Sequence, residues 1–225
     1  MRYQEQREKR IQIFEDTLRF CERDRRLTEA ITWTRKHTVF YPFRADFDKG
    51  KTDAVSCETM REEGVFGHTS DVCIITETDS VLQEVRNLHE NYPGGRIGVV
   101  NLCAAGFPGG GTIRGENTSE GRLCRATTLY PCLNTIGLHQ VYYDVNRKCH
   151  KLLDAEGCIY TPGIILVRED TEDAEYLEKS DRVSFDVISS AMIDQDDERE
   201  HRILAIARKY QIDILILQKN ERVLE

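Results

Sequence analysis

Residues 97–125 read IGVVNLCAAGFPGGGTIRGENTSEGRLCR, and the order of features in this stretch decides the fold class. It begins with an apolar, mostly β-branched run at 97–100, which is typical of a strand buried on both faces. Asn101 and several small residues follow, and then a glycine-rich loop at 106–111. Consecutive glycines let backbone N–H groups approach a ligand closely, most often a phosphate. The alternative is a tight connection that binds nothing.

A helix is predicted after the glycine-rich loop. The residues at 117–119, Asn-Thr-Ser, can each act as its N-cap, and Glu120 falls in the first turn, where the helix dipole favours an anion. Arg122 and Arg125 would lie on the polar side of this helix, where exposure to solvent is expected, although they can also face a phosphate.

The loop does not match the commoner phosphate-binding motifs. No Lys-Ser or Lys-Thr follows it at Walker spacing, and Gly109, Gly111 and Gly115 do not fit the G-x-G-x-x-G pattern. P-loop NTPases and Rossmann dehydrogenases are therefore disfavoured by the residues themselves.

The motifs around the loop follow a recognisable order. Asn101 is followed by PGGG at 108–111, a seven-residue spacer, SEG at 119–121 and LCR at 123–125. This order resembles that of microbial-type poly(ADP-ribose) glycohydrolases, and the resemblance implies a macrodomain-like fold that binds ADP-ribose. Further motifs in the family's order are Thr17-Leu18, Leu129-Tyr130-Pro131, Ile159-Tyr160-Thr161-Pro162 and Val167-Arg168.

Two departures from the family pattern bear on activity. The family has Gln-Glu-Glu where this chain has SEG at 119–121, so Gly121 takes the place of the catalytic second Glu. The family also carries a second glycine-rich loop, Gly-Ala-Trp-Gly-Cys-Gly, after its last core strand. Here the predicted strand at 212–217 runs into Gln-Lys-Asn-Glu-Arg at 218–222, and the sequence ends at Glu225. Both departures put hydrolysis in question, and this shortened C-terminus weakens the expectation of tight pyrophosphate binding.

The candidate site residues gather around the loop. Cleavage of a glycosidic bond needs a carboxylic acid to protonate the leaving oxygen, and Glu120 is the acid that fits this role. It can also be a ribose ligand, or a first-turn charge that only stabilises its helix. Asn101 can bind a ribose hydroxyl or cap the turn, and Phe107 can stack on a sugar or base or anchor the loop in the core. Gly109, Gly110 and Gly111 would donate N–H groups to a phosphate, and Ser119 completes the candidate ligand-binding set.

The composition excludes other classes of function. A net charge of −8 over 225 residues argues against general nucleic-acid binding. No apolar run approaches the roughly 20 residues of a membrane helix, and the N-terminus has no signal-peptide character. We therefore expect a cytoplasmic protein, or a nuclear one in a eukaryotic cell. Among eight cysteines, only Cys149-His150 with Cys158 resembles a metal cluster, and it lacks a fourth ligand, so neither a metal nor a cofactor is expected.

The chain reads as a single macrodomain-like domain over 1–225, with a three-layer α/β/α mixed sheet. Residues 1–36 form an N-terminal helical extension, and 44–70 an irregular insertion. Strands are predicted at 38–42, 72–75, 97–100, 141–143, 164–167, 183–191 and 212–217. Helices are predicted at 4–24, after Thr78 or Asp79, after the glycine-rich loop with Pro131 at its end, and before Tyr210; a turn is predicted at 160–163.

The leading hypothesis is an ADP-ribose-recognising protein related to poly(ADP-ribose) glycohydrolases, with hydrolysis of ADP-ribosyl conjugates left open. Its partner would be ADP-ribose or an ADP-ribosylated protein. The alternatives are a non-catalytic reader of ADP-ribose, favoured by Gly121, and a degenerate domain kept as a protein-interaction scaffold.

Overall fold

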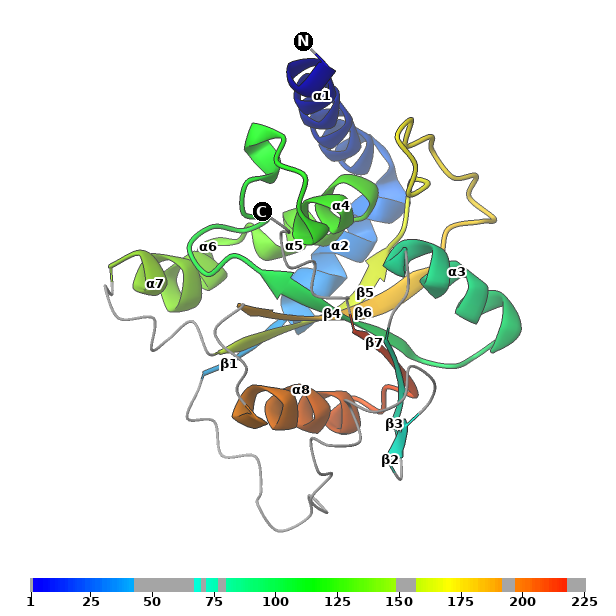
Figure 1. Ribbon diagram of the computed structural model, residues 1–225, viewed down its shortest axis with the longest axis vertical. Helices are drawn as coiled ribbons and strands as arrows, with labels where there is room; N and C mark the ends of the chain where they lie inside the picture. Colours follow the sequence, from blue (N-terminus) through cyan, green and yellow to red (C-terminus); the bar gives the residue numbers. More distant parts are fainter. Residues whose placement is uncertain are drawn as a thin grey trace.

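A mixed seven-stranded sheet forms the centre of the computed structural model, which describes residues 2–42, 67–69, 72–76, 80–148, 157–191 and 197–217 (Figure 1). The strand order is β1-β5-β6-β4-β7-β3-β2. β4 pairs in parallel with β6 and β7, and β7 with β3, whereas β1–β5, β5–β6 and β2–β3 are antiparallel. The strands are β1 (Val39–Tyr41), β2 (Gly67–Thr69), β3 (Val72–Ile75), β4 (Ile97–Cys103), β5 (Cys158–Ile165), β6 (Ser184–Ala191) and β7 (Ile214–Leu217).

Helices cover both faces of the sheet (Figure 1). The larger apolar cluster joins one sheet face to the first five helices, and the second cluster joins the other face to α8. The helices are α1 (Arg2–Arg23), α2 (Arg25–His37), α3 (Val81–Asn91), α4 (Ser119–Ala126), α5 (Leu129–Leu133), α6 (Ile136–Leu138), α7 (Asp144–Lys148) and α8 (Asp197–Lys209), with a 3₁₀ turn η2 (Thr112–Arg114) and a π-helical turn η3 (His139–Tyr143). The predicted three-layer α/β/α class is confirmed.

The central strand β4 is buried on both faces, as its apolar run predicted. Val99 packs into the larger cluster and Val100 into the cluster under α8, because successive side chains of a strand point to opposite faces. The strand at 72–75 is also confirmed, and the helix that follows is capped by Ser80. Thr78 and Asp79, the predicted caps, lie outside the described residues.

The N-terminal region contains two helices where one was predicted. Asp24 ends the first and caps the second: its side chain accepts hydrogen bonds from the backbone N–H groups of Arg26 and Leu27. Phe14 and Cys21 on α1, and Leu27 and Ile31 on α2, are buried in the larger cluster. Both helices therefore belong to the packed layer over the sheet.

One buried guanidinium holds α1 against the segment after β5. Arg168 donates from Nε to Thr17 Oγ1 (2.8 Å), from Nη2 to Asp16 Oδ2 (2.6 Å) and from Nη1 to the carbonyl of Ala174 (2.6 Å). Its Cζ also lies 3.6 Å from the centre of the Tyr176 ring. The contacts with Thr17 and Asp16 join residues more than 150 positions apart in the sequence.

Two local predictions were wrong in the middle of the chain. Residues 141–143, predicted as a strand, lie in the π-helical turn η3, because Tyr142 and Tyr143 are both buried in the same apolar cluster. Tertiary packing thus overrides the strand preference of Val-Tyr-Tyr. Pro131 does not end the helix after the loop: α4 ends at Ala126, and Pro131 lies in the first turn of α5, where its missing N–H removes no helical hydrogen bond.

The segment 160–163, predicted as a turn, belongs to β5. The register with β6 shifts between Thr161 and Ile164, and Gly163 has a φ of +66°. A bulge of this kind accommodates Pro162 and Gly163 within a strand. Of the predicted irregular insertion at 44–70, the structure describes 67–69, which form β2; the rest lies outside the described residues, as do Cys149, His150 and 218–222. No helix in the described parts of the chain is long and apolar enough to cross a membrane.

Candidate functional site

The glycine-rich loop follows the carboxyl end of β4, in the middle of the sheet. The loop leads through η2 into α4, whose N-cap is Thr118: its Oγ1 accepts a hydrogen bond from the N–H of Gly121 (3.0 Å). Open α/β sheets bind ligands beyond the carboxyl ends of their parallel strands. The loop therefore occupies the position at which a ligand site is expected.

The side chain of Glu120 turns back from α4 into the loop. Its Oε2 accepts a hydrogen bond from the N–H of Ala104 (2.9 Å) and its Oε1 from the N–H of Gly109 (3.1 Å). Only 3% of Glu120 is exposed. Burial raises the pKa of Glu120 to about 7, although the two amides and the side chain of Asn101 act in the opposite direction. A carboxyl group with this pKa exchanges its proton near neutral pH.

The three glycine amides are not equivalent. Gly109 donates to Glu120, and Gly110 donates to the carbonyl of Phe107 (3.0 Å). For the N–H of Gly111 the structure shows no acceptor among the described residues. Gly109 and Gly110 have φ values of +69° and +53°, which only glycine adopts without strain. The binding of a phosphate at 109–111 stays a prediction. It requires the N–H groups of Gly109 and Gly110 to give up their present acceptors, Glu120 and the carbonyl of Phe107, and to donate to the ligand instead.

Asn101 lies at the carboxyl half of β4 and is fully buried. Its Nδ2 donates to Ser189 Oγ on the neighbouring strand (3.1 Å), whereas its Oδ1 has no donor among the described residues. The hydroxyl of Tyr143 is likewise buried without a partner among the described residues. A buried acceptor without a donor costs about 1–3 kcal/mol, so Asn101 Oδ1 would be stabilised by a donor such as water or a ligand hydroxyl. No spacing in the sequence could have indicated Tyr143 or Ser189.

The two other predicted ligand residues lie at the surface of the loop and helix. Phe107 is 54% exposed, with the guanidinium of Arg147 at 4.7 Å from its ring centre. It is therefore not a core anchor, and Arg147 covers one face of its ring. Ser119 is the first residue of α4 and is partly buried, but Thr118 rather than Ser119 caps the helix.

Arg125 occupies the space beside Gly121. A Cβ atom on Gly121 would lie 2.9 Å from Arg125 Nη1, so the helix surface at this position presents a guanidinium and no carboxyl group. The expectation that Arg125 is solvent-exposed was wrong: it is 7% exposed, because α1 packs over this side of α4. Arg122 is partly buried.

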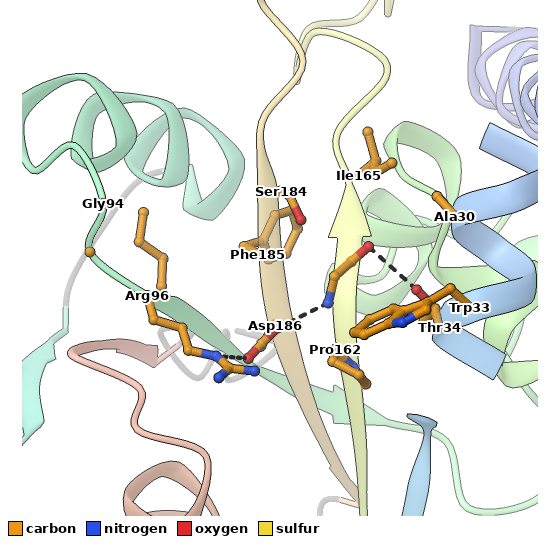
Figure 2. A pocket seen from close by; sticks show the side chains of 13 residues that line it. Ala30, Trp33, Thr34, Gly94, Arg96, Pro162, Ile165, Ser184, Phe185 and Asp186 are labelled. Atoms are coloured by element: carbon orange, nitrogen blue, oxygen red, sulfur yellow. Dashed lines mark hydrogen bonds and ion pairs between the residues drawn. The ribbon is translucent and has the colours of Figure 1, made fainter. Parts of the chain in front are cut away.

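A separate cavity of about 560 Å³ lies at the opposite end of the sheet, where β4 and β6 begin (Figure 2). Asp186 accepts hydrogen bonds there from Arg96 Nε (2.7 Å), the Tyr160 hydroxyl (2.7 Å) and the N–H of Gly163 (2.9 Å). Because the carboxylate is neutralised and its oxygens are engaged, we assign this network to holding the strand ends together. The loop beyond β4 is the better candidate for a functional site.

The mixed sheet between helical layers, with a glycine-rich loop at the end of its central strand, defines a macrodomain-like α/β domain. Residues 7–169 match the family described as microbial-type PARG (poly(ADP-ribose) glycohydrolase), catalytic domain. The chain belongs to this family. No curated protein sequence matches the chain.

Solved structures share the fold at low sequence identity. The poly(ADP-ribose) glycohydrolase from Thermomonospora curvata matches with a TM-score of 0.65 and 20% identity, over 89% of this chain and 76% of that one. The same enzyme bound to the inhibitor ADP-HPD matches with a TM-score of 0.68 and 16% identity, over 95% and 94%. The enzyme from Deinococcus radiodurans in complex with ADP-ribose matches with a TM-score of 0.60 and 22% identity, over 82% and 74%.

Proposed function

We propose that this protein binds ADP-ribose, free or attached to protein, at the loop beyond β4, and that it does not hydrolyse the glycosidic bond efficiently. Family membership and the fold shared with an ADP-ribose complex support the ligand class. The proposal that hydrolysis is inefficient rests on the position of Glu120, because both of its carboxyl oxygens accept hydrogen bonds from loop amides.

Hydrolysis requires an acid that reaches the leaving oxygen of the glycosidic bond. Glu120 is buried and turned into the loop, and the next position, Gly121, has no side chain. A rotation of Glu120 toward a substrate would leave the amides of Ala104 and Gly109 without their acceptor. A shift of one residue along a helix also changes the side-chain direction by about 100°, so Glu120 does not replace an acid at position 121.

The parts needed for recognition are nevertheless present. Asn101 Oδ1 is an acceptor without a described donor, which suits a ribose hydroxyl. The exposed ring of Phe107 offers a stacking surface for a base or sugar. The N–H of Gly111 has no acceptor among the described residues, and it can donate to a phosphate oxygen once the adjacent carboxyl group of Glu116 moves aside.

A binding measurement and a turnover measurement on the same protein test this proposal. Isothermal titration calorimetry with ADP-ribose is expected to give saturable heat, and an ADP-ribosylated protein incubated with the chain is expected to release no ADP-ribose. The Phe107→Ala variant should weaken binding by roughly tenfold, because it removes one stacking surface. Tyr92→Ala is the matched control: Tyr92 is a similarly exposed aromatic residue, 52% against 54%, at the other end of β4.

The Gly121→Glu variant tests why turnover is absent. It adds a carboxyl group at the position where the resemblance places the catalytic acid, and the nearest obstacle to its Cβ is the flexible end of Arg125. Release of ADP-ribose by this variant, but not by Gly121→Ala, is the expected result. Efficient turnover by the unmodified chain would overturn the non-hydrolytic part of the proposal.

A protein-interaction scaffold is the second candidate. The observation that favours it is the internal engagement of the Gly109 and Gly110 amides. Absence of heat at millimolar ADP-ribose would support the scaffold and remove the leading proposal.

A further inference from the structure

A cavity of about 380 Å³ lies between α1, the start of α4 and the segment 169–174, and both basic and acidic side chains line it. Arg10 reaches it from α1, and Arg122 and Arg125 reach it from α4. Arg125 lies about 140° around the helix from Glu120, so the two side chains leave α4 in different directions, and neither Glu120 nor the loop 106–111 lines this cavity.

Arg125 is the buried charge at this cavity. Its Nη1 donates to the carbonyl of Glu116 (3.2 Å), and no carboxylate of the described residues lies within 4 Å of its guanidinium. Burial and the neighbouring Arg10 and Arg122 lower the pKa of Arg125 to about 10, and Asp170 attracts it only from a distance. Burying a cation without an anion is strongly unfavourable. The position of the Arg125 guanidinium at the wall of a cavity is therefore explained if an anion from outside the protein binds in that cavity.

The carboxylates around the same cavity have other partners. Both oxygens of Glu169 accept from Arg86 Nη1 at 2.7 Å, and Asp170 accepts from the hydroxyl of Ser80 at 2.6 Å. Glu172 is exposed at the rim. Asp170 and Glu172 keep their negative charge, so the lining of the cavity carries both signs, and the buried charge without a carboxylate within 4 Å is Arg125.

Gly121 makes room for this arrangement. Because Gly121 has no Cβ, the guanidinium of Arg125 can lie against the backbone of α4, where a side chain at 121 would meet it. Arg125 also lines the cavity. A planar guanidinium with several donors is well suited to phosphate oxygens.

We propose that this cavity is a binding site for a phosphate or diphosphate group, with Arg125 as its principal ligand and Arg10 as a second cation. The source of the group is inorganic phosphate or pyrophosphate, or the phosphate end of a nucleotide. The site is separate from the proposed function, because its lining includes neither the loop 106–111 nor Asn101 or Glu120, and its recognition needs neither ribose nor adenine.

Thermal unfolding and calorimetry of the full chain test the site with inorganic phosphate, pyrophosphate and ADP as separate probes. Chloride at matched ionic strength controls for non-specific salt effects. We expect at least one probe to raise the melting temperature and to give saturable heat. The strongest of the three identifies the source of the group. If none of them acts beyond matched chloride, the proposal is overturned.

The Arg125→Met variant separates a ligand role from a structural one. Met keeps an apolar stem without the charge, so the affinity for the probe should fall by a factor of about 30 or more. Without the probe, the variant should melt no lower than the parent chain, because an uncompensated buried charge has been removed. The matched control is Arg19→Met, at a half-exposed position of α1.

Arg125→Lys provides an independent variant in case the Met variant does not fold. Lys keeps the charge but loses the planar set of donors, so intermediate binding is expected. Probe affinity that is unchanged in either variant would overturn the assignment. Loss of ADP-ribose binding alone would leave it intact, because the inorganic probes are read separately.

Discussion

Glu120 is a carboxyl group whose surroundings raise its pKa to about 7, and this has a consequence for stability. Between pH 4.5 and about 7 the folded protein holds a proton that the unfolded chain has released. The stabilisation from this proton is therefore complete below pH 4.5 and is lost as the pH rises through 7. The total is about 3 kcal/mol, from 1.36 kcal/mol for each pKa unit.

Urea denaturation of the parent chain and of Glu120→Gln, measured from pH 5 to pH 8, tests this consequence. The parent should lose stability relative to the variant by about 2–3 kcal/mol across the range, because only the parent titrates at this position. Gln offers one acceptor in place of two, so a constant offset between the two curves is also expected. Parallel curves would show that Glu120 is not the titrating group.

At the scale of single residues, the sequence predicted where a residue lies within its helix or loop better than it predicted the burial and the contacts of the side chain. The first-turn location of Glu120 and the N-cap at 117–119 followed from local rules and are observed. The turn of Glu120 into the loop and the burial of Arg125 depend on the loop amides and on α1. α1 is distant in the sequence, and the loop amides are backbone groups that every residue type has. A rule based on residue spacing therefore cannot predict either contact.

At the scale of elements, the contact between α1 and the turn before α4 depends on one glycine. Gly115 has a φ of +71°, and a Cβ there would lie 2.4 Å from the carbonyl oxygen of Arg7. Arg7 Nε donates to the carbonyl of Arg114 (2.6 Å) and Arg10 Nε to that of Gly115 (2.7 Å). The turn and the helix are therefore in direct backbone contact.

The Gly115→Ala variant should lower the free energy of unfolding by about 2–4 kcal/mol, since it combines a left-handed conformation with a steric clash. Hydrogen exchange should also become faster in α1, because the variant pushes this helix away from the turn. Gly137→Ala is the control: nothing lies within 4 Å of its Cβ position and its φ is not positive. Equal stability of the two variants would mean that α1 does not require close approach at Gly115.

Element types were predictable where hydrophobic periodicity was strong and unpredictable where packing overrode it. The strands at 72–75 and 97–100 and the helix with Leu82, Val85 and Leu88 show clear periods and are observed. Residues 141–143 have strand-forming side chains, yet they are helical, because two adjacent tyrosines fill one cluster. Pattern alone contains no information about that cluster.

At the scale of the whole molecule, the two ends of the sheet have separable roles. The loop site lies beyond the end of β4, and the network around Asp186 lies at its beginning, about 20 Å away along the strand. The loop site consists of exposed groups and of amides that can change their hydrogen-bond partners. The Asp186 network consists of a buried carboxylate that accepts from three donors. Changes at one end should therefore not reach the other.

The Asp186→Ala variant should lower the free energy of unfolding by about 2–3 kcal/mol, because Tyr160 and Gly163 lose a buried acceptor. Its affinity for ADP-ribose should equal that of the parent, whereas Phe107→Ala should show the reverse pattern. Trp33, the single tryptophan, reports unfolding by fluorescence, and Asp181→Ala serves as a control at an exposed aspartate. A joint loss of stability and affinity in Asp186→Ala would mean that the two ends are coupled.

The order of strands and helices along the chain was sufficient to predict the layered α/β class, and the motif order was sufficient to predict the family. The strand order within the sheet was not predictable, because it depends on which crossovers pack against which face. The proposed phosphate cavity was equally hidden, since α1, α4 and residues 169–174 meet only in the folded molecule.

The guanidinium of Arg168 ties the first helix to a segment that the ribosome makes about 150 residues later. Until that segment has emerged, the apolar stripe of α1 has no complete docking partner, and the nascent chain must keep it shielded from other hydrophobic surfaces. The docking of α1 is therefore completed only after the segment around Arg168 has been synthesised.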